Sequence, residues 1–165
     1  MASRLDTGIP RGPATPVRPR SEAPSGPWAE SRRAGGAPST LVEFHLYAGD
    51  LQSLQCLPRT LPQLQTLTVQ GNYALASLAG LPEELPALRT LELRAAITDL
   101  SGLPRMPKLA ALYLTETQVG DIEGLDQKCP NLVSLDIRGT GVKSLKGLPA
   151  SVRVLYAGDQ VSDLG

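Results

Sequence analysis

The sequence has 165 residues, of which 41% are hydrophobic, and this length and composition predict one folded domain. Sixteen basic and sixteen acidic residues give a net charge of zero, which excludes a general electrostatic attraction to nucleic acid or membranes. No segment approaches the roughly 20 consecutive apolar residues of a transmembrane helix, and the N-terminus lacks the continuous apolar core of a secretory signal.

Residues 1–40 are expected to form an irregular arm that is either disordered or held by a partner. Seven prolines and five glycines remove amide donors and stop a helix from propagating. Six arginines and three acids give the arm a net charge of +3, whereas ten bases and thirteen acids give residues 41–165 a net charge of −3. Extended arginines can follow a phosphate backbone or an acidic protein groove. The candidate contact residues of the arm are Arg11, Arg18, Arg20, Trp28, Arg32 and Arg33.

Three interpretations of the arm stay open: a tail without a specific role, a contact segment for RNA or an acidic protein, and a mitochondrial targeting peptide. The arginines and the scarcity of acids suit a targeting peptide, but the prolines disfavour the amphipathic helix that such a peptide needs. Trp28 is the one large anchor in the arm, and it is expected to dock on the folded domain or on a partner.

Residues 41–165 are predicted to form a solenoid, because one apolar pattern occurs six times in succession. The first five repeats have the form LxxLxL, with other large apolar residues in place of some leucines, followed after a turn by three apolar residues spaced three apart. The sixth repeat is cut short after the second of these residues, Leu164. Successive repeats begin 23, 24, 21, 23 and 20 residues apart. The repeats begin at Leu41, Leu64, Leu88, Leu109, Leu132 and Val152.

This spacing predicts a short strand in each repeat, with alternate side chains inward, and a return segment over the same core. Stacked repeats would pair their strands into a parallel sheet on the concave side. The second repeat has one extra residue between Val69 and Leu75, in the turn after the strand. Glycines that recur before a leucine, such as Gly80 and Gly147, are expected at turns or close approaches.

Two cysteines, Cys56 and Cys129, occur without a paired spacing, so neither a disulfide framework nor a zinc site is expected, and a reducing intracellular compartment fits best. Cys129 is aligned with Leu61, Leu85 and Met106 of other repeats, which predicts a buried structural role.

The segments LRTLELRAAITDLSGL and LVSLDIRGTGVKSLKGL resemble the short intracellular leucine-rich repeats of internalins, of a phosphatase-regulating leucine-rich subunit, of an axonemal dynein light chain and of a leucine-rich spliceosomal subunit. The resemblance covers residues 41–164. It implies an α/β-type leucine-rich-repeat solenoid of about six repeats with a concave parallel sheet, and it specifies no partner. The turn position that usually holds asparagine is occupied by Gly49, Asn72, Ala96, Thr117, Thr140 and Gln160, so an asparagine ladder is excluded and backbone amides should bond to threonine hydroxyls, carbonyls or water.

Catalytic chemistry is not expected. His45 is the only histidine, and no GxSxG, Walker or GxGxxG motif is present. No cofactor or metal site is therefore predicted.

Binding is better supported, because residues that alternate with the strand leucines must point out of the sheet. Tyrosine and arginine are common among them, and both are enriched at protein interfaces. Glu43, Glu92 and Asp136 would repel phosphate on this face. The candidate partner-binding residues are His45, Tyr47, Thr68, Gln70, Glu92, Arg94, Tyr113, Thr115, Asp136, Arg138 and Tyr156.

The expected function is a non-enzymatic interaction or scaffolding subunit of a larger intracellular assembly. The sequence stops at Gly165 within the sixth repeat without a capping helix, which favours a covering partner and a hetero-complex over a homo-oligomer. An RNA-associated subunit with residues 1–40 on phosphate and a regulatory subunit docked on an enzyme are the alternatives. Cytoplasmic placement is preferred, with mitochondrial, cytoskeletal and axonemal placement as alternatives and no membrane partner.

Overall fold

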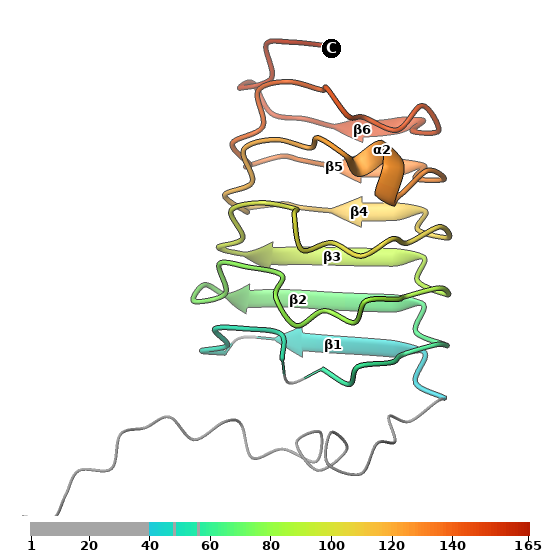
Figure 1. The fold of residues 1–165 in the computed structure, drawn as a ribbon. Helices are drawn as coiled ribbons and strands as arrows, with labels where there is room; N and C mark the ends of the chain where they lie inside the picture. The colour runs from blue at the N-terminus through green and yellow to red at the C-terminus, as the bar shows by residue number, and fades with distance from the viewer. Residues whose placement is uncertain (1–39, 48, 56) are drawn as a thin grey trace, which may run out of the picture.

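The computed structural model describes residues 40–165 except 48 and 56, and its fold is a parallel β-solenoid with turns of about 23 residues (Figure 1). Six strands form a single sheet in sequence order, and each is parallel to its neighbours. The strands are β1 (Glu43–Tyr47), β2 (Thr66–Asn72), β3 (Thr90–Ala95), β4 (Ala111–Tyr113), β5 (Ser134–Asp136) and β6 (Val154–Tyr156). The prediction of a repeating solenoid with a parallel sheet is confirmed.

The apolar pattern forms the core as predicted. In β3, Leu91 and Leu93 are fully buried, while the alternating Thr90, Glu92 and Arg94 are half-buried on the other face. The return segments place further leucines against the inward face, which joins the turns into one continuous core. Burial of each leucine side chain contributes about 1.5–3 kcal/mol to the free energy of unfolding. The solenoid is therefore stabilised by the same burial in every turn rather than by any single contact.

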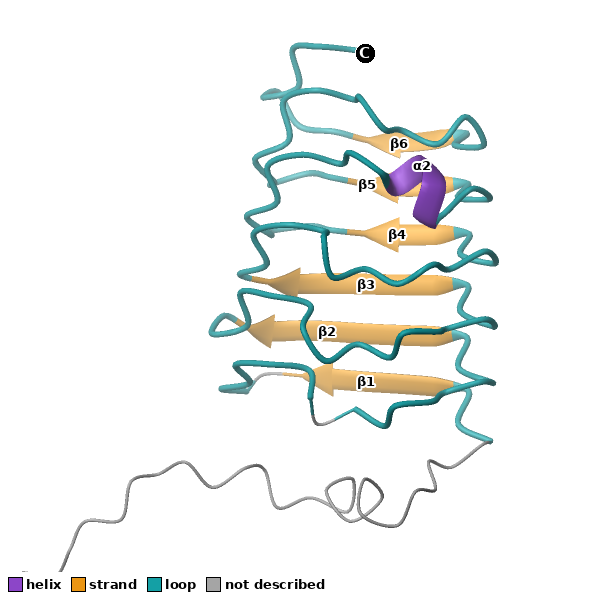
Figure 2. Cartoon of the chain, in the orientation of Figure 1, coloured by secondary structure: helices purple, strands orange, loops and turns teal. Residues whose placement is uncertain are grey.

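The return segments contain little helix, which corrects the expected α/β character. Among the described residues the single helix is α2 (Leu125–Lys128), and the other return segments are irregular (Figure 2). Prolines such as Pro86, Pro107 and Pro130 recur in these segments, and they interrupt helix propagation. Backbone groups are paired between turns instead, as where the Met106 amide donates to the Lys128 carbonyl at 2.9 Å.

Gly80 and Gly147 lie where two turns approach closely, as predicted. Both have positive φ, at 99° and 88°. A Cβ atom at Gly80 would lie 2.6 Å from the carbonyl carbon of Leu54, and one at Gly147 would lie 2.6 Å from the carbonyl oxygen of Ile122. Only glycine meets both requirements at these positions.

Cys129 is a core residue, which confirms its predicted position. Its side chain is fully buried, and the residues at the aligned positions of other repeats, Leu61, Leu85 and Met106, are at most 1% exposed. Burial raises the pKa of the Cys129 thiol from 9.0 to about 11. The thiolate is therefore scarce at neutral pH, and a structural role fits better than a reactive one.

The turn after each strand is held by carbonyls rather than by an asparagine ladder. The amides of Gln118 and Gly141 donate to the carbonyls of Ile97 and Val119 in the preceding turn, both at 2.8 Å. The Thr140 hydroxyl donates to the Ile137 carbonyl at 2.7 Å, and Thr117 makes the corresponding bond in its own turn. The expected replacement by carbonyls is thus observed. The Thr140 hydroxyl also accepts the Val142 amide at 3.4 Å, as expected for a threonine at this position.

Candidate functional site

The candidate site is the open face of the sheet, defined by the side chains that alternate with the buried strand leucines. Strand pairing places these residues in columns that run across the sheet, and the predicted alignment is confirmed over β1 to β6. A second outward-facing column, nearer the carboxyl ends of the strands, is formed in register by Tyr47, Gln70 and Arg94. Thr115 and Arg138 come two residues after the ends of the paired segments of β4 and β5, so they lie beyond the ladder. The central column consists of His45, Thr68, Glu92, Tyr113, Asp136 and Tyr156.

The predicted contact residues differ in accessibility. Tyr47 and Tyr156 are 64% and 47% exposed, so their rings are available to a partner. Thr68 and Asp136 are only 4% and 2% exposed, which leaves them to support their neighbours rather than to form the surface. The position of a residue along its strand therefore predicts which face its side chain points to. The packing of neighbouring side chains decides what fraction of that side chain is exposed to a partner.

A shallow, open depression of about 250 Å³ lies at the carboxyl ends of β1, β2 and β3. Tyr47, Gln70, Gly71, Tyr73 and Arg94 line it. Three of these were predicted from the sequence, and Tyr73 was not. The Tyr73 side chain is 70% exposed, the largest exposed fraction of any aromatic residue in the described chain.

The extra residue of the second repeat accounts for Tyr73. The pairing of β2 with β3 shifts register between Gln70 and Asn72, as a bulge requires. Gly71 adopts a φ of 69° at this point, and the longer turn presents Tyr73 at the rim of the depression. The insertion between Val69 and Leu75 is the sequence signal that could have identified this residue.

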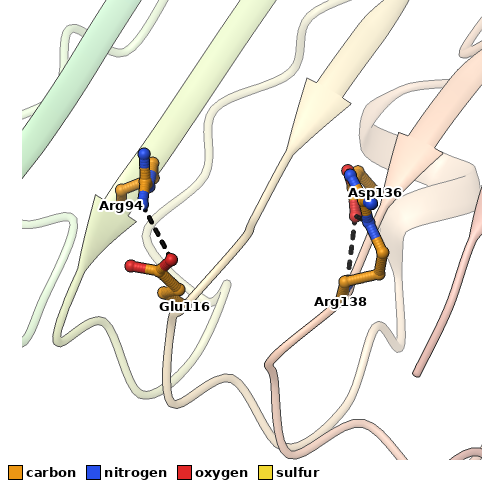
Figure 3. A network of polar contacts seen from close by, with 4 residues as sticks. All are labelled: Arg94, Glu116, Asp136 and Arg138. Carbon is orange, nitrogen blue, oxygen red and sulfur yellow. Dashed lines mark hydrogen bonds and ion pairs between the residues drawn. The ribbon is translucent and has the colours of Figure 1, made fainter. Parts of the chain in front are cut away.

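Arg94 is held by a carboxylate from the next turn. Its Nη2 atom donates to Oε1 of Glu116 at 2.7 Å (Figure 3), and this bond and the charge of Glu116 raise the pKa of Arg94. Glu116 has a φ of 60°, the single positive value among described residues other than glycine. Gly71 and Gly139 occupy the corresponding left-handed position in other turns, each with a φ of 69°. Glu116 was not predicted, because its role depends on a turn conformation that glycine normally adopts.

A second ion pair lies within a single turn, at the carboxyl end of β5. Arg138 binds the buried Asp136 carboxylate through Nε and Nη2, the latter at 2.6 Å from Oδ2 (Figure 3). Burial alone would raise the pKa of Asp136, but hydrogen bonds from the side chain and backbone of Arg138 outweigh it, so the pKa is lowered. The guanidinium also lies 5.1 Å from the ring centroid of Tyr156, within cation–π range. These contacts link the Tyr156 ring to the Asp136–Arg138 pair on the open face.

No protein-family model matches this sequence, and no solved structure matches it significantly. The properties of the site therefore rest on its own geometry.

Among the residues that the structure describes, no group of three or more histidine, cysteine, aspartate or glutamate side chains is arranged to hold a metal ion. In the same part of the chain, no helix has the length and apolar character needed to cross a membrane. The predicted arm contacts lie outside the described residues: Arg11, Arg18, Arg20, Trp28, Arg32 and Arg33.

Proposed function

We propose that the chain is a leucine-rich-repeat protein of the short intracellular type, and that it binds a protein partner across the open face of its sheet. The LxxLxL pattern, the turn length and the parallel strand pairing support the repeat type. The missing asparagine ladder and the scarcity of helix are departures within that type.

Exposed aromatic rings on a fixed sheet are the observation that carries the proposal. Tyr47 and Tyr156 are exposed at opposite edges of the face, on the first and last strands. Tyrosine buries much area on binding at a low entropic cost, and it is enriched among residues that dominate binding energy. The surface is also ordered before binding, because Arg138 holds Tyr156 and Glu116 holds Arg94.

The charge of the face favours protein over nucleic acid. Among the described residues of this face, the carboxylates include those of Glu43, Glu92, Glu116 and Asp136, and the cations that lie beside them are Arg94 and Arg138. Both arginines already pair with one of these carboxylates, so a phosphate backbone would meet net negative charge. The role is non-enzymatic, as a scaffolding subunit of an intracellular complex or as a regulatory subunit that docks on an enzyme.

An RNA-associated subunit is the second candidate, and the charge of residues 1–40 favours it. The six arginines of that segment give it a net charge of +3, and in this alternative they contact phosphate while the solenoid holds protein. Nuclease treatment and salt dependence separate it from the leading proposal.

The test is affinity purification of the full chain, with and without nuclease, alongside two variants. A stoichiometric protein partner should survive nuclease and be lost from Tyr113→Ala/Tyr156→Ala, while Gln127→Ala, a matched change on α2 of the return side, retains it. Thermal melting checks that both variants are folded. Retention of the partner by the tyrosine variant would contradict binding through the open face.

A further inference from the structure

The half of the open face over β1, β2 and β3 has a charge and an aromatic content that identify the kind of group it binds. We define this β1–β3 surface as the depression beside Tyr47 and Tyr73 together with the carboxylate of Glu92, which binds Gln70, and the Arg94–Glu116 pair. It is separate from the Asp136, Arg138 and Tyr156 cluster of the opposite half.

The carboxylates of the β1–β3 surface outnumber its cations. Arg94 binds Glu116 at 2.7 Å, and its charge also interacts with Glu92, so two carboxylates share one guanidinium. Glu92 Oε1 accepts a hydrogen bond of 2.6 Å from the neutral amide of Gln70, which lines the depression. With one guanidinium and two carboxylates, the surface has a net charge of −1.

The aromatic residues of this half surround the same depression. Tyr47 and Tyr73 are 64% and 70% exposed, and both line it together with Gln70. His45 stacks on Tyr47 with ring centroids 5.9 Å apart and an angle of 6° between the planes, which orders the Tyr47 ring. A cation that lies over such rings is attracted to their π faces, and the nearby carboxylates add a direct electrostatic attraction.

We propose that the β1–β3 surface receives a lysine or arginine side chain from an extended segment of the partner protein. The aliphatic stem packs between Tyr47 and Tyr73, and the charged end is directed toward Glu92. An acidic segment fits worse, because the guanidinium that lines the depression, that of Arg94, already binds Glu116, and an added carboxylate would face Glu92. This inference rests on the proposed function and assigns the chemistry of the partner.

The experiment measures binding of two labelled peptides to the full chain by fluorescence anisotropy. One peptide alternates threonine with lysine, and the other replaces every lysine by glutamate. The lysine peptide should bind, more weakly at high salt, and the glutamate peptide should not. Glu92→Gln should weaken binding about tenfold through the loss of one charge-assisted contact. Tyr73→Ala should weaken it by a similar factor through the loss of apolar and cation–π contact with the ring. Glu83→Gln, which removes an exposed carboxylate from the return segment, should leave it unchanged.

Three results would overturn the inference. Equal or tighter binding of the glutamate peptide would assign an acidic ligand instead. Binding of the lysine peptide only after the six arginines of residues 1–39 are replaced by glutamine would show that the chain's own arm is the occupant. Failure of the lysine peptide to bind in either background would also reject it. In that last case, continued loss of the purified partner from Tyr113→Ala/Tyr156→Ala would leave the proposed function standing.

Discussion

The guanidinium of Arg94 and the carboxylate of Glu116 join two neighbouring turns of the solenoid through a bond of 2.7 Å. The carboxylate is presented from a left-handed backbone conformation, with a φ of 60°, that glycine occupies in two other turns. A side chain at such a position costs about 1 kcal/mol relative to glycine. Local strain retained in this way is often found at functional surfaces, and here it presents the Glu116 carboxylate to Arg94 beside the depression at the carboxyl ends of β1–β3.

Substitution of Glu116 should separate the strain from the ion pair. Glu116→Gly relieves the left-handed backbone and removes the carboxylate, whereas Glu116→Ala removes the carboxylate and keeps the strain. We expect the glycine variant to be more stable than the alanine variant by about 1 kcal/mol in urea unfolding, because both lose the same exposed pair. Equal stability of the two variants would show that residue 116 is not held in the left-handed region.

The central leucines should matter more than exposed apolar residues at the end of the stack. Leu112 is fully buried in β4, so Leu112→Ala should lower the free energy of unfolding by about 2–5 kcal/mol. Leu164 is 80% exposed, and Leu164→Ala should change it by less than about 0.5 kcal/mol. Chemical denaturation of both variants provides the comparison, and a similar cost at the two sites would contradict the placement of the core.

Because of the Asp136–Arg138 ion pair, the free energy of unfolding should depend on pH in the acidic range. Its folded-state pKa is lowered below 3.8, so the native chain binds fewer protons than the unfolded chain as pH falls through that region. The contribution of the ion pair to the free energy of unfolding is complete above the pKa of Asp136 in the unfolded chain, 3.8, and is lost as the pH falls through the lower folded-state pKa. Asp136→Asn should cost about 1–3 kcal/mol at neutral pH and little well below pH 3.8. A cost that is independent of pH would mean that packing, rather than charge, is lost.

The buried thiol of Cys129 should make the free energy of unfolding depend on pH in the alkaline range, with stability falling as the pH rises. The pKa of Cys129 is raised from 9.0 to about 11, so the folded chain keeps its proton where the unfolded chain has lost it. Stability should therefore fall as pH rises from about 9 toward 11, and Cys129→Ala should reduce this slope. The measurement is the urea midpoint across that range in a Cys56→Ser background, which leaves Cys129 as the one thiol. Rapid alkylation of Cys129 in the native protein at neutral pH would contradict its burial.

Much of the fold followed from the apolar spacing, because burying a leucine constrains the direction of its strand neighbours. The column that joins Glu92 to Tyr113 was predicted in register for this reason. Tyr73 and Glu116 were not predicted, since a bulge and a left-handed turn depend on local backbone geometry rather than on hydrophobic period. Helix content was overestimated because prolines interrupt the return segments.

The most direct test of binding through the open face places a photo-crosslinking amino acid at single positions of the full chain in cell extract. Position Thr115 samples the open face, and Gln127 on α2 samples the return side. Binding through the open face predicts one protein adduct from position 115 that resists nuclease and none from position 127. Equal adducts at both positions, or an adduct from position 127 alone, would contradict it.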